Sequence, residues 1–155
     1  MNTYEKLHQE AYDDGVIVRE VVLKSNSDGL YCNGKIAINK ARLSTTNEKI
    51  CVLPEELGHH HTSYGNILDL SNVNNSKQEY KARLYAYNKL VGLNGLINAY
   101  KAGCRSKHDM AEYLDVTEEF LDEVLECYTR KFGVSTEVDN YVIAFIPNLI
   151  VMELV

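Results

Sequence analysis

The sequence predicts an α+β fold in which strands and helices occupy separate stretches of the chain. Asn33-Gly34 separates two short apolar runs, and this dipeptide accepts the positive φ angles of a type I′ β-hairpin turn. Between residues 45 and 132 apolar side chains recur mostly at helical spacing, and runs typical of strands return after residue 133. We therefore expect a small sheet, then several helices, then terminal strands.

Composition limits the classes of protein to consider. The chain has 155 residues, 45% of them hydrophobic, which is enough for one core, and its net charge of −6 argues against a general affinity for nucleic acid. Four cysteines without C-x-x-C spacing and an N-terminus without an apolar signal core favour a reduced, cytoplasmic setting with buried thiols. The longest apolar run, residues 141–155, is broken by Pro147, so no membrane span is expected.

The N-terminal third is expected to form a helix followed by strands. Residues 3–13 carry apolar side chains on one side and end before Gly15, as a helix does. Residues 16–23 are rich in β-branched side chains, which is typical of a strand. Together with the hairpin arms at residues 30–32 and 35–38, this strand predicts a small antiparallel sheet.

A helix with candidate metal ligands follows the sheet. Thr45 and Glu48 have the spacing of a capping box, so the helix is expected to begin at Thr45 or Thr46. Its apolar stripe consists of Ile50, Leu53 and Leu57. Pro54 lacks an N–H group and therefore predicts a bend, or a first regular turn that begins near Pro54 itself.

Two pairs of candidate ligands alternate along this helix. Glu55 and His59 lie four residues apart, as do Glu56 and His60, and either pair shares one helix face. We favour Glu55 and His59, with His60 as the alternative ligand, because this register leaves Glu56 where the H-E-x-x-H pattern has its general base. The first histidine of that pattern is Glu55 here. His61 falls toward the apolar side and is expected to be a hydrogen-bonded packing residue.

A catalytic zinc site needs a third protein ligand and an open position for water. Glu79 is the best candidate, because it lies in the first turn of the helix expected at residues 76–90, where small alanines allow a close approach to the first helix. The alternative is a carboxylate that only stabilises the helix dipole. Tyr64 is the candidate stabiliser of a tetrahedral oxyanion, with a packing role as its alternative. Four basic residues of the second helix could attract an acidic substrate or form a solvated face: Lys77, Lys81, Arg83 and Lys89.

The chain is expected to divide after residue 92. Residues 1–92 would form the core with the ligand helix, and residues 93–155 a helical segment with terminal strands, packed with the core as one unit. Helices are expected at residues 93–102, 107–114 and 117–132, and strands at residues 134–138, 141–146 and 149–154.

These C-terminal helices have the sequence pattern of a helix-turn-helix, and Thr117 is expected to cap the third helix. Residues 103–132 contain four Lys or Arg and eight Asp or Glu, so they would repel phosphates. A packing or partner-docking role is therefore favoured over DNA binding.

A resemblance to a known family is carried by Glu55-Glu-Leu-Gly-His59, by the Asn-Gly hairpin before it and by Glu79-x-x-Ala82-x-x-Tyr85-Ala86-x-x-x-Leu90 after it. This combination resembles the ImmA/IrrE-type metallo-endopeptidases, in particular the short forms encoded by phages and mobile elements. The resemblance extends over nearly the whole chain, as far as the terminal strands.

The resemblance implies a zincin-like core and a zinc-dependent endopeptidase that cleaves a repressor protein of a phage or mobile element. It implies that His59 and Glu79 are ligands and that Glu56 activates the metal-bound water. Glu55 stands where the family has histidine. Its extra negative charge should make the metal-bound water less acidic, and it should allow the site to bind Mn²⁺ as well as Zn²⁺. Weaker hydrolysis is one expected result. The other is an inactive member that acts as an antirepressor by binding the repressor.

Overall fold

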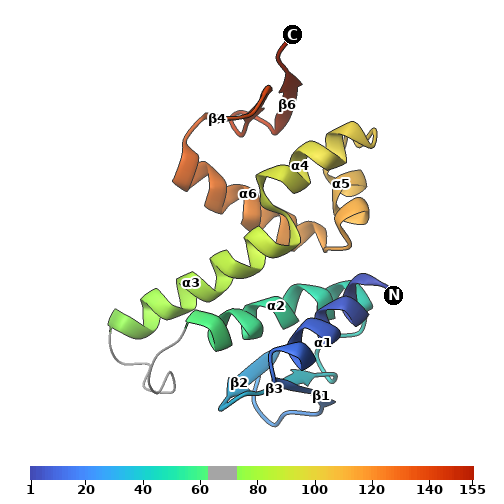
Figure 1. Ribbon diagram of the computed structural model, residues 1–155, viewed down its shortest axis with the longest axis vertical. Coiled ribbons are helices and arrows are strands. Elements are labelled where there is room, and N and C mark those ends of the chain that lie inside the picture. The colour runs from blue at the N-terminus through green and yellow to red at the C-terminus, as the bar shows by residue number, and fades with distance from the viewer. Residues whose placement is uncertain (63–72) are drawn as a thin grey trace. The chain divides into compact units, whose positions relative to one another are not determined.

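The computed structural model describes residues 1–62 and 73–155. They form two compact units, Met1–Lys89 and Leu90–Val155 (Figure 1). Each unit combines helices with a three-stranded sheet, so the predicted α+β class is confirmed. A search of the described residues finds no helix with the length and apolar character needed to cross a membrane.

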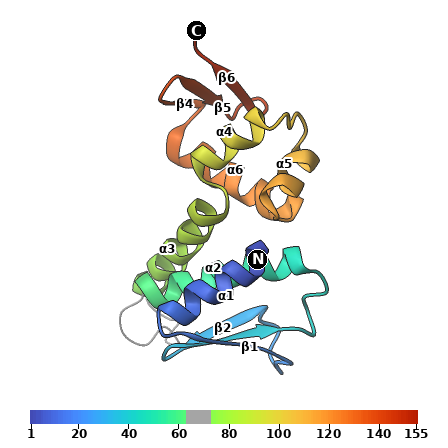
Figure 2. The same ribbon diagram turned by 45° about the vertical axis from the view of Figure 1, so that its right-hand side comes forward.

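The first unit begins with helix α1 (Thr3–Asp13), as predicted. Asn2 and Glu5 form a capping box at its start, and Gly15 follows its end with a φ of 77°. The sheet of this unit consists of β1 (Ile17–Val21), β2 (Gly29–Cys32) and β3 (Lys35–Asn39). Helices α1 and α2 lie on the same side of this sheet (Figure 2).

The predicted hairpin is confirmed. Asn33 and Gly34 have φ angles of 49° and 78°, and β2 pairs antiparallel with β3 on either side of them. Both central residues thus have the positive φ that a type I′ turn requires.

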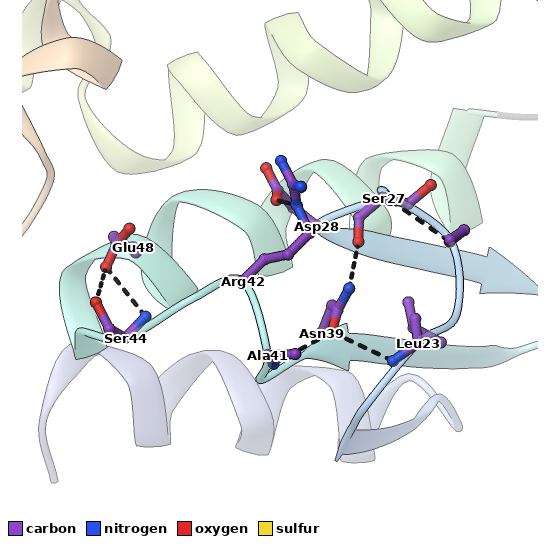
Figure 3. Close-up of polar contacts among 9 residues, drawn as sticks. Leu23, Ser27, Asp28, Asn39, Ala41, Arg42, Ser44 and Glu48 are labelled. Atoms are coloured by element: carbon purple, nitrogen blue, oxygen red, sulfur yellow. Dashed lines mark hydrogen bonds and ion pairs between the residues drawn. The ribbon is translucent and has the colours of Figure 1, made fainter.

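The prediction of a wholly antiparallel sheet is wrong, because β1 pairs parallel with β3 and the strand order is β1-β3-β2. The chain between β1 and β2 must therefore cross the end of β3. Asn39, which is 1% exposed, holds this crossing (Figure 3). Its Oδ1 accepts hydrogen bonds from the backbone N–H groups of Leu23 and Ala41, both at 3.2 Å, and its Nδ2 donates to the Ser27 carbonyl at 2.9 Å.

Helix α2 (Thr46–Thr62) begins at the predicted capping box. The Glu48 N–H donates to Thr45 Oγ1 at 3.1 Å, and the Thr45 N–H donates to Glu48 Oε1 at 2.9 Å. The predicted apolar stripe is confirmed, since Ile50, Leu53 and Leu57 are at most 2% exposed. The helix runs through the buried Pro54, so the expectation of a first turn near Pro54 is wrong. Helix α3 (Val73–Leu90) begins slightly before the predicted residue 76, so the expectation that Glu79 lies in its first turn is wrong.

The second unit contains the expected helices and strands, with ends within two residues of the predicted ones. They are α4 (Gly92–Lys101), α5 (Lys107–Leu114), α6 (Glu118–Phe132), β4 (Ser135–Val138), β5 (Tyr141–Ala144) and β6 (Ile150–Glu153). Thr117 caps α6 as predicted, with its Oγ1 accepting from the Phe120 N–H at 3.1 Å. The strands pair antiparallel in the order β4-β5-β6.

All four cysteines are free thiols, but they are not all buried as predicted. Cys127 is buried, Cys51 and Cys104 are half-buried, and Cys32 is exposed. The neighbour of Cys32 in β2, Tyr31, faces α2, so the alternation of a strand turns Cys32 to the opposite face of the sheet.

Candidate metal centre

Three donor side chains from two helices converge in the first unit. Glu55 and His59 lie one turn apart on α2, and Glu79 lies on α3. Each offers one ligand atom, and these atoms all lie within 4.8 Å of one another. His59 Nε2 is 3.5 Å from Glu79 Oε2. The structure thus brings together the three residues that the sequence predicted as ligands.

The donor set fits a divalent cation. Ligand atoms that share one ion at 2.0–2.2 Å are separated by roughly 3.5 Å, so small side-chain rotations would bring these three into range. One imidazole with two carboxylates suits zinc, and the extra oxygen ligand also suits manganese. The carboxylates repel one another without a cation, which favours occupation by a positive ion.

The separation of the ligands depends on the close contact between α2 and α3. A Cβ atom built on Gly58 would lie 2.7 Å from the Ala82 carbonyl oxygen and 2.9 Å from the Ala82 Cα. Gly58 directly precedes His59, and Ala82 lies one turn after Glu79. The absence of a side chain at Gly58 therefore lets the candidate ligands of the two helices approach each other.

Glu56 lies beside the ligands and is only 8% exposed. Strand β2 passes directly over it, since a Cβ on Gly29 would lie 3.1 Å from Glu56 Cγ. Burial, followed by the charges of Glu55 and Glu79, raises the pKa of Glu56 to about 8. A divalent cation in the cluster would oppose this increase in pKa, because it favours the ionised carboxylate.

The cluster opens onto a cleft of about 470 Å³. The edge strand β2, helix α2 and helix α3 all contribute to its walls, and its apolar lining consists of Leu30, Tyr31 and Val52. Clefts of this size hold small ligands or short peptide segments. The arrangement therefore combines a candidate cation site, a buried carboxylate and space for a substrate.

Of the four basic residues that the sequence offered on α3, the cleft contains Arg83, which the sequence alone did not distinguish from the others. It lines the cleft, and its Nε is 3.6 Å from Glu55 Oε1. The pKa of His59 is lowered chiefly by burial, and Arg83 shifts it in the same direction while Glu79 opposes the shift. The four-residue spacing between Glu79 and Arg83 was the available signal, because it puts both side chains on one face of α3.

The other predicted residues have different surroundings. His60, the alternative ligand, has its Nδ1 2.8 Å from the Tyr31 hydroxyl. The donor cluster of the described residues therefore contains Glu55 and His59, the favoured pair. His61 is exposed, so its placement on the apolar side is wrong. Its expected role as a polar packing residue is supported, since its Nε2 is 3.2 Å from Asp14 Oδ2 and its ring centroid is 5.4 Å from that of Tyr85. Tyr64 lies outside the described residues.

Comparison with known proteins does not add a family assignment. The sequence matches no protein-family model and gives no significant match among curated proteins. The geometry of the cleft is therefore the main basis for a functional proposal.

Proposed function

We propose that this chain is a metal-dependent endopeptidase in which Glu55, His59 and Glu79 hold zinc or manganese and Glu56 is the general base. The observation that carries the proposal is the convergence of three ligand atoms within 4.8 Å of one another beside a nearly buried carboxylate. The resemblance to the ImmA/IrrE-type family, with the zincin-like core that it implies, supports the same function.

Glu56 would move the proton in both halves of the reaction. It accepts a proton from water as the water oxygen adds to the carbonyl carbon of the peptide, and it returns the proton to the amine nitrogen as the C–N bond breaks. A bound cation would supply Lewis acidity toward the water and the carbonyl group. Because Glu56 is adjacent to Glu55 on α2 and is held against β2, its carboxylate has a fixed place next to the reacting groups.

The proposed substrate is a repressor protein of a phage or mobile element. Acidic residues of the cleft, including Asp28, Glu55 and Glu79, would repel the phosphates of a nucleic acid. In the second unit, α6 exposes a further acidic set: Glu118, Glu119, Asp122, Glu123 and Glu126. We therefore assign the helix-turn-helix-like segment to contact with a protein partner and not to DNA.

The test is incubation of the metal-loaded protein with helix-turn-helix repressors encoded by genes that neighbour its own, followed by mass spectrometry of the products. We expect cleavage at a specific bond. Glu56→Gln should lower turnover by about 10²- to 10⁴-fold while the protein still binds metal, because only the proton acceptor is removed. Glu137→Gln makes the same chemical change at an exposed position of β4, outside both the cleft and the helix-turn-helix-like segment, and should leave turnover unchanged.

An antirepressor would give a different pattern. Both wild type and Glu56→Gln would then inactivate the repressor equally, with the repressor left whole. That result would contradict the endopeptidase and support a binding protein that uses the same cleft.

A further inference from the structure

We propose that Arg83 is a catalytic residue of the cleft, whose guanidinium binds the carbonyl oxygen of the scissile peptide and stabilises the negative charge that forms there. This assignment rests on the proposed endopeptidase function, and it adds a second electrophilic group beside the bound cation.

The position of Arg83 is suited to this role. It lies four residues after Glu79 on the same face of α3 and lines the same cleft. Its Nε is 3.6 Å from Glu55 Oε1, so the guanidinium lies next to the donor cluster. The side chain is 58% exposed, which leaves it accessible to a substrate that enters the cleft.

The charges around the cleft favour a positive side chain at this place, in addition to a bound cation. Among the described residues that line it, Arg83 is the single Lys or Arg, whereas Asp28, Glu55, Glu56 and Glu79 are acidic. Asp28 is paired with Arg42 at 2.7 Å (Figure 3). A developing oxyanion near the other three carboxylates would be repelled unless positive charge lies close to it.

The position of Arg83 is explained less well by a role in stabilising the fold than by contact with the substrate. The pair with Glu55 is 58% and 32% exposed on its two sides, and ion pairs with this exposure contribute little to stability. A guanidinium has five N–H donors in a planar fork, so contact with Glu55 through Nε leaves donors for a second oxygen atom. Arg83 can therefore contact Glu55 and the substrate carbonyl at the same time.

The hydrolysis needs only the peptide and one water molecule as reactants. The water oxygen bonds to the carbonyl carbon, the carbonyl π electrons move to the oxygen beside Arg83, and the water proton goes to Glu56. When the C–N bond breaks, the electrons return to the carbonyl and the proton goes to the amine nitrogen. Arg83 keeps its proton throughout, since guanidinium groups are not deprotonated in proteins.

The experiment compares Arg83→Ala and Arg83→Lys with Lys81→Ala. Lys81 is an exposed residue of the same helix that does not line the cleft, so its replacement removes the same charge from a neighbouring position. Three quantities are measured for each protein: kcat and KM for repressor cleavage, Mn²⁺ affinity by electron paramagnetic resonance, and affinity of the Mn²⁺-loaded protein for a phosphonate dipeptide. The phosphonate carries the tetrahedral anionic group that an oxyanion-binding residue recognises.

We expect Arg83→Ala to lower kcat by about 10²-fold or more, with KM changed far less. Its affinity for the phosphonate dipeptide should fall while its Mn²⁺ affinity stays at the wild-type value. Arg83→Lys should recover part of both losses, because lysine keeps the charge without the planar fork. Lys81→Ala should behave as wild type.

Other outcomes overturn the assignment. Wild-type kcat and phosphonate affinity in Arg83→Ala would leave the endopeptidase in place but remove Arg83 from catalysis. Loss of Mn²⁺ binding would make Arg83 a positioning residue for Glu55, and a rise in KM alone would mean that it binds substrate and not the oxyanion. A wild-type protein that neither binds Mn²⁺ nor cleaves the repressor would overturn the proposed function itself.

Discussion

Glu56 has surroundings that are unusual for a carboxylate. It is 8% exposed, and burial together with the charges of Glu55 and Glu79 raises its pKa to about 8. Buried carboxyl groups with neighbouring like charges cost free energy of folding, and perturbed groups in clefts are common at functional sites. The sequence could nominate Glu56 from its place beside the ligand pair. It could not show the burial, because β2 covers Glu56 only through tertiary packing.

Gly29→Ala tests the packing that holds Glu56 in place. The new Cβ would lie 2.9 Å from Val52 Cγ1 and 3.1 Å from Glu56 Cγ, so both side chains must move. We expect the free energy of unfolding, measured by urea denaturation, to fall by about 1–3 kcal/mol, and turnover to fall as well. The control is Gly95→Ala in α4, where the nearest atom is 3.4 Å away and alanine should be neutral or stabilising. Unchanged stability and turnover in Gly29→Ala would contradict this packing.

The start of helix α2 shows a pH-sensitive interaction. Hydrogen bonds from Ser44 and Thr45 lower the pKa of Glu48 below its ordinary value of 4.5. The folded state therefore prefers the ionised carboxylate. Its contribution to stability is present above the unfolded pKa and is lost as the pH falls through the folded pKa.

We predict that Glu48→Gln is less stable than wild type at pH 7 and that the difference shrinks as the pH is lowered from 5 to 3. Urea denaturation at several pH values measures it. Thr45→Ala, which removes the reciprocal cap, should lower stability by about 1 kcal/mol at pH 7. A deficit of Glu48→Gln that is constant with pH would show that the carboxylate charge is not involved.

The contact between α2 and α3 limits how closely the candidate ligands of the two helices approach each other. In Gly58→Ala the new Cβ would lie 2.7 Å from the Ala82 carbonyl oxygen, a backbone atom that moves only if the helix moves. We expect Mn²⁺ affinity, measured by titration calorimetry, to fall by at least about tenfold, because ligand geometry tolerates only sub-ångström changes. The matched control is again Gly95→Ala. Wild-type Mn²⁺ affinity in Gly58→Ala would mean that this contact does not set the site.

Elements with local signals could be predicted from the sequence, and elements that depend on distant contacts could not. The Asn33-Gly34 turn and the Thr45 capping box are determined by residues within a few positions of each other, and both are present. The parallel pairing of β1 with β3 depends on the crossing that Asn39 holds, and no local pattern indicates it. The same reason explains the error in the placement of His61, whose partner Asp14 directly follows the end of α1.

At the level of the molecule, the candidate site is formed by segments of the first unit that lie far apart in the sequence. Helical spacing could nominate Glu55 and His59, and the position of Glu79 in the next expected helix, beside small alanines, could nominate Glu79. Their convergence depends on how closely α2 and α3 approach each other. In the sequence, the signal for this approach is limited to the small residues Gly58 and Ala82. The place of Arg83 in the cleft follows from that same approach, so the sequence could name Arg83 only as one of four basic residues of the second helix.

A cation that binds only the folded chain should stabilise the whole first unit. At an ion concentration of 100 times the Kd, linkage adds about 2.7 kcal/mol to the free energy of unfolding. We expect Zn²⁺ or Mn²⁺ to raise the Tm and EDTA to reverse the increase, as measured by differential scanning calorimetry. In Glu79→Gln the metal should no longer raise the Tm, whereas in Glu119→Gln it should raise the Tm as in wild type. Equal Tm values with and without metal would count against a site in the cleft.

Anomalous scattering from crystals grown with Mn²⁺ locates the ion itself. We predict one strong anomalous peak between α2 and α3, bonded to Glu55, His59 and Glu79 at about 2.0–2.2 Å. An empty position there at saturating Mn²⁺, with Glu55 still paired with Arg83 and His59 with Glu79, would contradict the metal centre and the endopeptidase built on it.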